Sequence, residues 1–295
     1  MDFSLFFSQL MGGIGNGAVY ASLALALVLI FRTTGILNFA QGEMALYSTY
    51  LFWYFTQRSV PVLLAILITM GISFIGGALI ERVIIRPVED KSPLVIVIVT
   101  IGLFLALNSI VQVQFGADIK TGLPRFYAAT TWRPGNVQIS ADTLVLVAML
   151  AIVCLLLYVL FQHTKVGLAM RAVSSNAESS RLSGIPVGNV LMLGWGLAAA
   201  LGALAGVLII PQLGLEASAM QSILFYSFAA AALGGFDSPV GAVVGGIIVG
   251  VAQALATQYV HFLDGITLIV PFGIILVVLM VRPQGLFGTK RVERV

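Results

Sequence analysis

A carboxylate stands in a short polar segment of a very apolar chain. Asn38, Gln41 and Glu43 fall within the sequence GILNFAQGE, where the apolar stretch 35–57 begins. Gly42 lies between two of them and indicates a helix break or a tight helix contact. Charged side chains inside membrane segments are costly, so those that persist commonly mark the path of a substrate or an ion. Asn38, Gln41, Gly42 and Glu43 are therefore predicted to line a substrate path.

A structural role for the same residues stays open. Asn38 and Glu43 are also suited to cap or brace a broken helix near the membrane interface. In that case Arg32 or Arg82 is the expected partner of the Glu43 carboxylate. The two interpretations differ in whether the carboxylate is paired within the chain.

A second polar pair lies in the apolar stretch 94–114. Asn108 and Gln112 are four residues apart, which places both side chains on one face of a helix. Amides on one helix face can line a pore, and they can equally form hydrogen bonds between helices. We include both residues in the candidate substrate path.

The segment 167–186, GLAMRAVSSNAESSRLSGIP, is polar and lies between two apolar stretches. Ser175 and Glu178 have the spacing of a helix capping box, Gly184 is a typical helix stop, and Pro186 prevents continuation. The pattern predicts a short soluble helix. A membrane protein does not need such a helix for its own stability, so a partner is its expected reason.

Several kinds of chemistry have no basis in the sequence. There is no GxxxxGK[ST] motif, so the chain is not expected to hydrolyse ATP or to bind a cofactor itself. His163 and His261 are far apart and lack clustered Cys or carboxylates, so no metal site is expected. The single Cys154 excludes an internal disulfide. No catalytic triad can be assembled, and an enzyme is not predicted.

The elements that must position these residues are membrane helices. The 295 residues are 59% hydrophobic and 9% charged, whereas soluble domains carry about 25% charged residues. We predict one all-α, polytopic membrane domain over residues 1–295 with about eight to ten spans. The apolar stretches are 5–31, 35–57, 60–81, 94–114, 143–162, 188–212, a short one at 222–234, 240–260 and 266–281.

The basic residues indicate an orientation. Alternating the sides of the membrane puts eleven of the 15 Lys and Arg on one side and four on the other, which identifies the larger group as cytoplasmic. The N-terminus is then outside, and segment 167–186 and the C-terminal tail, with Lys290, Arg291 and Arg294, are cytoplasmic. The pI near 9.1 follows from these topology signals, and no nucleic-acid partner is expected.

Segment 115–142 is predicted to be an extracytoplasmic loop. It contains Gly, Pro and charged residues together with Phe126, Tyr127 and Trp132. Such a loop can be a lid or a docking surface, and aromatic anchoring at the membrane interface explains it equally well.

Six sequence blocks resemble the permease subunits of branched-chain amino acid ABC transporters, the LivH-like group. GILNFAQGE resembles the family signature G-x-x-N-F-A-[HQ]-G-E. The other blocks are ERVIIRP, TIGL, GLAMRAVSSNAESSRLSGI, ALGGFDSPVGAVVGG and RPQGLFG, and together they cover almost the whole chain in family order.

The resemblance implies an importer of the bacterial inner membrane with several partners. These are a second, homologous permease subunit, two cytoplasmic ATPase subunits that use ATP, an extracytoplasmic substrate-binding protein, and the lipid bilayer. It also implies that 167–186 is a coupling helix that docks on an ATPase. The candidate coupling residues are Arg171, Ser175, Asn176, Ala177, Glu178 and Gly184; all except Ser175 match the family pattern.

Two departures from the family pattern bear on the substrate. Tyr226, Ser227 and Phe228 stand where many members have Lys-Ala-Phe, and Asn108 stands where Gln is common. Family members are assigned branched-chain and other amino acids, urea, amides or aromatic acids, and the sequence does not choose among them. A self-contained secondary transporter or channel is the alternative function, although such proteins usually carry paired intramembrane charges.

Overall fold

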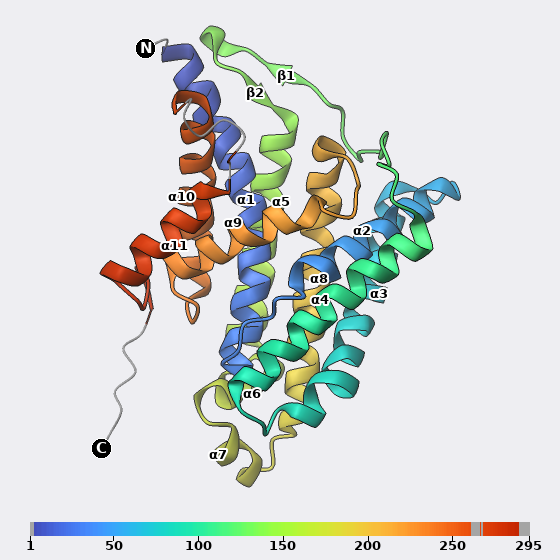
Figure 1. The fold of residues 1–295 in the computed structure, drawn as a ribbon, viewed down its shortest axis with the longest axis vertical. Coiled ribbons are helices and arrows are strands. Elements are labelled where there is room, and N and C mark those ends of the chain that lie inside the picture. The colour runs from blue at the N-terminus through green and yellow to red at the C-terminus, as the bar shows by residue number, and fades with distance from the viewer. Residues whose placement is uncertain (1–2, 261–265, 267, 289–295) are drawn as a thin grey trace. The chain divides into compact units, whose positions relative to one another are not determined.

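The computed structural model describes residues 3–260, 266 and 268–288 (Figure 1). This part of the chain is almost entirely helical, as predicted for an all-α membrane protein. The helices are α1 (Phe3–Thr34), α2 (Gln41–Gln57), α3 (Val62–Ile80), α4 (Pro93–Phe115), α5 (Ala141–His163), α6 (Lys165–Ser175), α7 (Ala177–Leu182), α8 (Val187–Leu213), α9 (Ala219–Gly234), α10 (Pro239–Tyr259) and α11 (Ile269–Val281).

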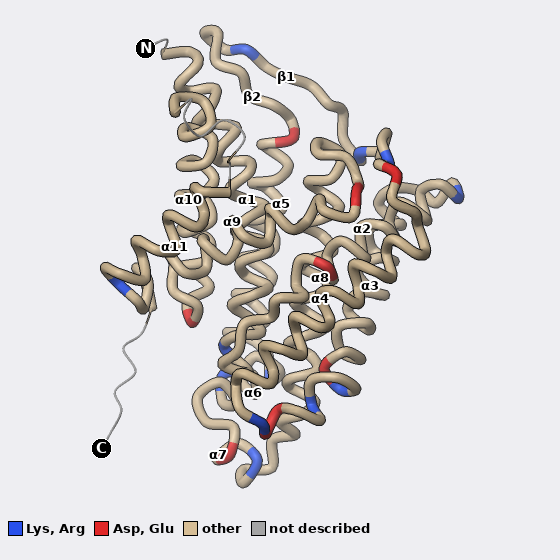
Figure 2. The backbone as a smooth tube through the Cα atoms, viewed as in Figure 1, with Lys and Arg blue, Asp and Glu red and all other residues tan. Residues whose placement is uncertain are grey.

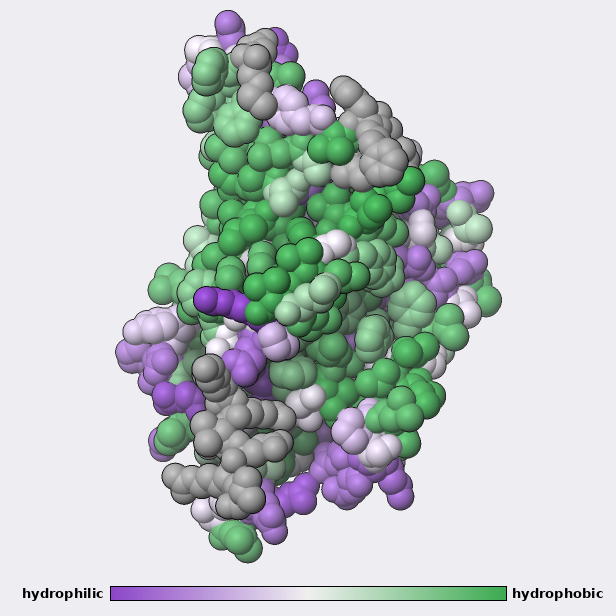
Figure 3. All heavy atoms as spheres, turned by 60° about the vertical axis from the view of Figure 1, so that its left-hand side comes forward, coloured by the Kyte–Doolittle hydropathy of each residue, from purple (hydrophilic) through white to green (hydrophobic). Residues whose placement is uncertain are grey.

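Each apolar stretch predicted from the sequence contains a helix, although the helix in 35–57 begins only at Gln41. Six helical segments are long and apolar enough to span a membrane, beginning at Phe3, Val62, Pro93, Ala141, Val187 and Pro239; α9 and α11 are shorter apolar helices. In α8, 89% of the most apolar 18-residue window is buried, against 17% in α5. Hydrophobic side chains cover much of the surface in Figure 3, as expected for helices that face lipid.

Contacts between Cα atoms divide the chain into two compact units. The first contains Met1–Val28, Tyr127–Leu150 and Ser222–Val295; the second contains Leu29–Phe126 and Ala151–Gln221. The sequence predicted one domain because it contains no linker. Boundaries between the two units fall inside α1, α5 and α9, so each of these helices contributes residues to both units.

Glycines bring α1 and α10 close together in the first unit. A Cβ on Gly13 would lie 2.8 Å from Cα of Val251, and one on Gly17 would lie 2.7 Å from Cα of Ile247. A Cβ on Gly250 would overlap the backbone of Gly17. The small-residue spacings Gly13/Gly17 and Gly246/Gly250 therefore pack helices within the chain.

The second unit is built around the contact of α3 with α8. A Cβ on Gly77 would lie 2.6 Å from both the Trp195 carbonyl oxygen and the Ala199 Cβ, and a Cβ on Gly196 would lie 2.9 Å from the Phe74 carbonyl oxygen. Because both helices present glycine at the contact, their backbones approach closely and form a rigid pair. Helix α2 packs on this pair, and Ser73 Oγ on α3 donates to Ser48 Oγ at 2.7 Å.

The α3 helix ends in an irregular turn. A π-helical turn, η1 (Glu81–Ile85), is followed by the 3-10 turn η2 (Arg86–Val88). Pro87 explains the end of the helix, because its ring lacks an N–H and clashes with the preceding turn. Single π-turns inside helices are frequent at functional sites.

The predicted loop 115–142 contains little regular structure. Within the first unit it forms a two-stranded antiparallel hairpin of β1 (Thr131–Trp132) and β2 (Ile139–Ser140), joined by the 3-10 turn η3 (Pro134–Asn136). Trp132 is 51% exposed. In the second unit, the backbone of Lys120 pairs with that of Leu215.

Candidate functional site

Two buried amides brace the start of α2. After α1 ends, Gly35 adopts a positive φ of 72°, and Asn38 Oδ1 accepts a hydrogen bond from the Ala40 N–H at 3.0 Å. Asn38 Nδ2 donates to Gln41 Oε1 at 3.2 Å, and Gln41 Nε2 donates to the Ala198 carbonyl of α8 at 2.9 Å. Bracing was one of the two roles expected for Asn38 from the sequence, whereas Gln41 was predicted only to line the substrate path; the polar atoms of both amides are used here.

Glu43 differs from its two polar neighbours. Its side chain is fully buried in the first turn of α2, next to the buried Gly42. Asn108 Nδ2 donates to its Oε2 at 3.0 Å, whereas Oε1 is buried without a hydrogen-bond partner. The expected pairing of Glu43 with Arg32 or Arg82 is not found among the described residues, since Oε2 accepts from Asn108 and Oε1 has no hydrogen-bond partner.

The α4 amides reach Glu43 as a connected pair. Gln112 Nε2 donates to Asn108 Oδ1 at 2.6 Å, which confirms the predicted shared helix face. Asn108 Nδ2 also donates to the Ala217 carbonyl at 2.8 Å. Gln112 is exposed and Asn108 is partly buried, so hydrogen bonds lead from the surface of α4 to the buried carboxylate.

Two members of this cluster were not found from the sequence. The Ala217 carbonyl belongs to the connection between α8 and α9, and the Gln221 side chain on α9 is a further polar neighbour of the Glu43 carboxylate. A backbone carbonyl has no sequence signal. Gln221 is an amide near the start of an apolar helix, and this position could have indicated that α9 contributes to the cluster.

The polar segment 167–186 begins inside α6. Thr164 caps α6, because its Oγ1 accepts from the Gly167 N–H at 3.0 Å. A Cβ on Gly167 would overlap the Leu160 carbonyl oxygen, so the close turn between α5 and α6 requires glycine. Arg171, an exposed α6 residue, donates to Gln162 Oε1 at 3.1 Å.

The predicted cap of the second short helix is wrong by one residue. Ser175 ends α6, and Asn176 caps α7 by accepting from the Ser179 N–H at 2.8 Å. Asn176 is extended, with φ −158°, and its own N–H closes α6 on the Ala172 carbonyl. It therefore ends one helix and begins the next.

The remaining features of α7 follow the sequence. Ala177 opens it, and the exposed Glu178 lies in its first turn, where a carboxylate is favoured by the helix dipole. Gly184 follows the helix with φ 81° and its N–H bonds to the Arg181 carbonyl, as predicted for a helix stop. Leu182 is 86% exposed, and sequence reasoning missed this apolar side chain on a polar helix.

Charged contacts tie this segment to the end of α3. Arg181 Nη2 lies 2.8 Å from Glu89 Oε1. Arg86 binds Glu81 through Nε at 3.2 Å and Nη2 at 2.7 Å, and its Nη2 also donates to the Gly188 carbonyl at 2.6 Å. Arg86, one of the basic residues counted as topology signals, also joins η1 to the start of α8.

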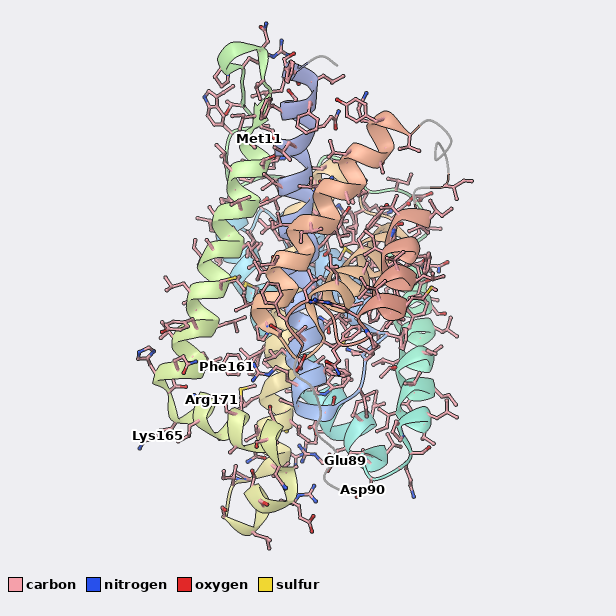
Figure 4. The ribbon with its side chains drawn as sticks, turned by 90° about the vertical axis from the view of Figure 1, so that its left-hand side faces the viewer. Met11, Glu89, Asp90, Phe161, Lys165 and Arg171 are labelled. Atoms are coloured by element: carbon pink, nitrogen blue, oxygen red, sulfur yellow. The ribbon has the colours of Figure 1, made fainter. Side chains whose placement is uncertain are left out.

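Many charged residues of the second unit lie at this end. Figure 2 shows charged positions grouped around α6 and α7, and another group at the opposite end of the unit. Figure 4 places Glu89 and Asp90 at the same end of the unit as Lys165 and Arg171. That this end is cytoplasmic stays a prediction from the basic-residue count. His261 and the basic tail, Lys290, Arg291 and Arg294, lie outside the described residues.

A family model and a curated relative both match this chain over most or all of its length, and both describe the same kind of protein. The family model described as branched-chain amino acid transport system / permease component matches residues 9–279. The high-affinity branched-chain amino acid transport system permease protein LivH of Salmonella typhimurium is 30% identical, covering 100% of this chain and 99% of the relative.

Two further proteins align with nearly the whole chain. The high-affinity branched-chain amino acid transport system permease protein BraD of Pseudomonas aeruginosa is 29% identical, with 98% of each chain covered. The solved structure of PsaBC from Streptococcus pneumoniae in complex with Fab aligns over 96% of this chain and 94% of that one, at 13% identity and a TM-score of 0.49. The family match over 9–279 shows that this chain belongs to the branched-chain amino acid permeases of ABC transporters, as a LivH-like, multi-pass inner-membrane transport protein and not an enzyme.

Proposed function

We propose that this chain is the permease subunit of an ATP-driven importer for branched-chain amino acids. The observation that carries the proposal is the pair of short helices α6 and α7, which interrupts the membrane helices with a polar, exposed segment. Asn176 and Gly184 hold α7 in a defined position, and the apolar Leu182 projects from it with 86% exposure. An exposed leucine on a capped polar helix is suited to a hydrophobic groove of a partner.

The partner proposed for this segment is a cytoplasmic ATPase subunit. The chain has no P-loop, so ATP must be hydrolysed elsewhere. Motion of an ATPase against α7 would reach α3 through Arg181 and Glu89, and would reach α8 through the chain itself. Since α3 and α8 pack as a rigid pair, that motion would shift α2, which carries Glu43.

The remaining assembly follows from the family. We propose a second, homologous permease, two ATPase subunits, and an extracytoplasmic binding protein that docks on loop 115–142. The N-terminus is placed outside and the C-terminus in the cytoplasm, following the basic-residue count. The cluster of Glu43, Asn108 and Gln112 is proposed to face the substrate path, with Asn38, Gln41 and Gly42 fixing the helix that carries it.

Reconstitution of the complete complex in proteoliposomes tests this function. Leucine uptake is expected to require the binding protein and ATP hydrolysis. Glu178→Lys and Leu182→Asp should lower uptake per ATP hydrolysed, while the affinity of the binding protein for leucine stays unchanged. Asp90→Asn, a charge change at an exposed position at the same end, is the control and should behave as wild type.

Two results would contradict the proposal. One is full leucine uptake with catalytically inactive ATPase subunits, which would favour the secondary transporter or channel. The other is normal coupling in both α7 variants, which would remove the role assigned to this segment.

A further inference from the structure

Three acceptor oxygens in the second unit surround one donor. Asn108 Nδ2 donates to Glu43 Oε2 at 3.0 Å and to the Ala217 carbonyl at 2.8 Å. The other carboxylate oxygen of Glu43, Oε1, is buried without a hydrogen-bond partner among the residues that the structure describes. The acceptors come from α2 and the α8–α9 connection, and the donor comes from α4. The two N–H groups of Asn108 Nδ2 are used by Glu43 Oε2 and the Ala217 carbonyl, and Gln221 on α9 is a further polar neighbour of the carboxylate. Oε1 is the oxygen of this cluster that keeps an open acceptor position.

Ionised Glu43 would be an uncompensated negative charge in this cluster. Glu43 is fully buried, and no described Lys or Arg forms an ion pair with it. An unpaired buried carboxylate is strongly destabilising, and a glutamine of nearly the same shape would avoid the cost. Asn38 and Gln41, the neighbouring polar residues, have used their polar atoms for bracing. Glu43 differs from them in keeping an acceptor atom, Oε1, without a hydrogen-bond partner among the described residues.

We propose that Glu43, Asn108 and the Ala217 carbonyl form a recognition site for a primary ammonium group, that of the translocated amino acid. This rests on the proposed function and adds the part of the substrate that is recognised. An ammonium group has three N–H donors and a positive charge, so it can satisfy both Glu43 oxygens and the Ala217 carbonyl. In the structure, Asn108 Nδ2 donates to two of these three oxygens.

The α4 amides indicate how the ammonium group reaches the carboxylate. Gln112 is exposed, and its Nε2 donates to Asn108 Oδ1 at 2.6 Å. Gln112 can therefore bind the Asn108 side chain after the substrate has displaced it from Glu43. This exchange leaves no donor unpaired if Asn108 Nδ2 then donates to Gln112 Oε1, the acceptor atom of the same amide. The polar contacts from Gln112 to Glu43 then mark the route from the α4 surface to the site.

The test uses the complete complex in proteoliposomes, with leucine as the probe. Glu43→Gln should lower ATP-driven leucine uptake by about tenfold or more, the effect of one charge-assisted hydrogen bond. The leucine-loaded binding protein should still stimulate ATP hydrolysis, because docking and coupling are untouched. Glu216→Gln is the matched control: this partly exposed carboxylate accepts from Ser218 at 2.6 Å in the same α8–α9 connection, and uptake should stay unchanged.

A second measurement separates recognition from a structural role. The melting temperature of the purified Glu43→Gln permease should equal or exceed that of wild type, because an unpaired buried charge is removed. A lower melting temperature together with reduced uptake would make Glu43 a structural brace and overturn the proposal. Wild-type uptake by Glu43→Gln would overturn it directly.

Further controls identify which kind of cation the site binds. They also separate failure of this inference from failure of the proposed function. Replacement of Na⁺ and K⁺ by choline, whose quaternary ammonium group has no N–H donor, should leave wild-type uptake unchanged. Loss of uptake in that medium would assign the site to an inorganic cation and overturn the ammonium assignment. Absence of ATP-dependent leucine uptake in the wild-type complex would contradict the proposed function itself, and the inference would fall with it.

Discussion

Replacing Arg86 should cost more stability than any other single charge change at its end of the chain. Its guanidinium holds the Glu81 carboxylate through two hydrogen bonds and also donates to the Gly188 carbonyl. Glu81 is 1% exposed, so Arg86→Met leaves its charge buried and unpaired. Breaking a buried ion pair costs about 3–5 kcal/mol. Because the Arg86 side chain is 32% exposed, we expect the lower end, about 3 kcal/mol.

The two partners should not be equivalent. Glu81→Met leaves Arg86 without its carboxylate, but that guanidinium can reach solvent and keeps the Gly188 carbonyl, so its cost should be smaller. Removing both charges should bring the free energy of unfolding back to within about 1 kcal/mol of wild type, because no buried charge is then left. Arg82→Met, an exposed arginine on the same π-turn, is the control and should change stability by less than about 0.5 kcal/mol.

The assay is unfolding of the purified permease in mixed micelles as the fraction of denaturing detergent rises. The four variants form a double-mutant cycle plus a control, so the pairwise energy is measured directly. The reasoning is refuted if Arg86→Met unfolds within about 1 kcal/mol of wild type. It is refuted equally if the double variant loses as much as the two single variants together.

Two further predictions concern helix ends and helix contacts. Asn176→Ala should cost about 1 kcal/mol in α7, seen as faster hydrogen exchange over 177–182, whereas Ser175→Ala should leave exchange unchanged; equal effects would return the cap to Ser175. Gly250→Ala should destabilise the permease by about 1–3 kcal/mol in the same unfolding assay, because the added Cβ overlaps the α1 backbone. Gly71→Ala, with open space around its Cβ position, should be neutral or slightly stabilising, and an equal loss in both glycine variants would exclude packing as the cause.

The sequence by itself determined where the membrane helices lie and where they end. Apolar stretches of sufficient length became helices because backbone polar groups in lipid must be paired within the segment. Gly184 ended α7 where expected, since the positive φ that glycine allows is a local property. The cap at Asn176 was missed by one residue, because Ser175 and Asn176 are both good caps and the choice depended on where α6 finished.

Only the tertiary structure decided which polar groups meet. Asn108 and Gln112 were paired correctly from their spacing, but Glu43 is 65 residues away from Asn108, and the Ala217 carbonyl is 109 residues away. The sequence offered Arg32 and Arg82 as partners for Glu43, and Arg86 only as a topology anchor. Those assignments depend on how α2, α4 and the α8–α9 connection pack, and on glycines that let α3 approach α8. Periodicity along one helix carries no information about such contacts between helices, so the unpaired state of Glu43 became visible only once the chain was folded.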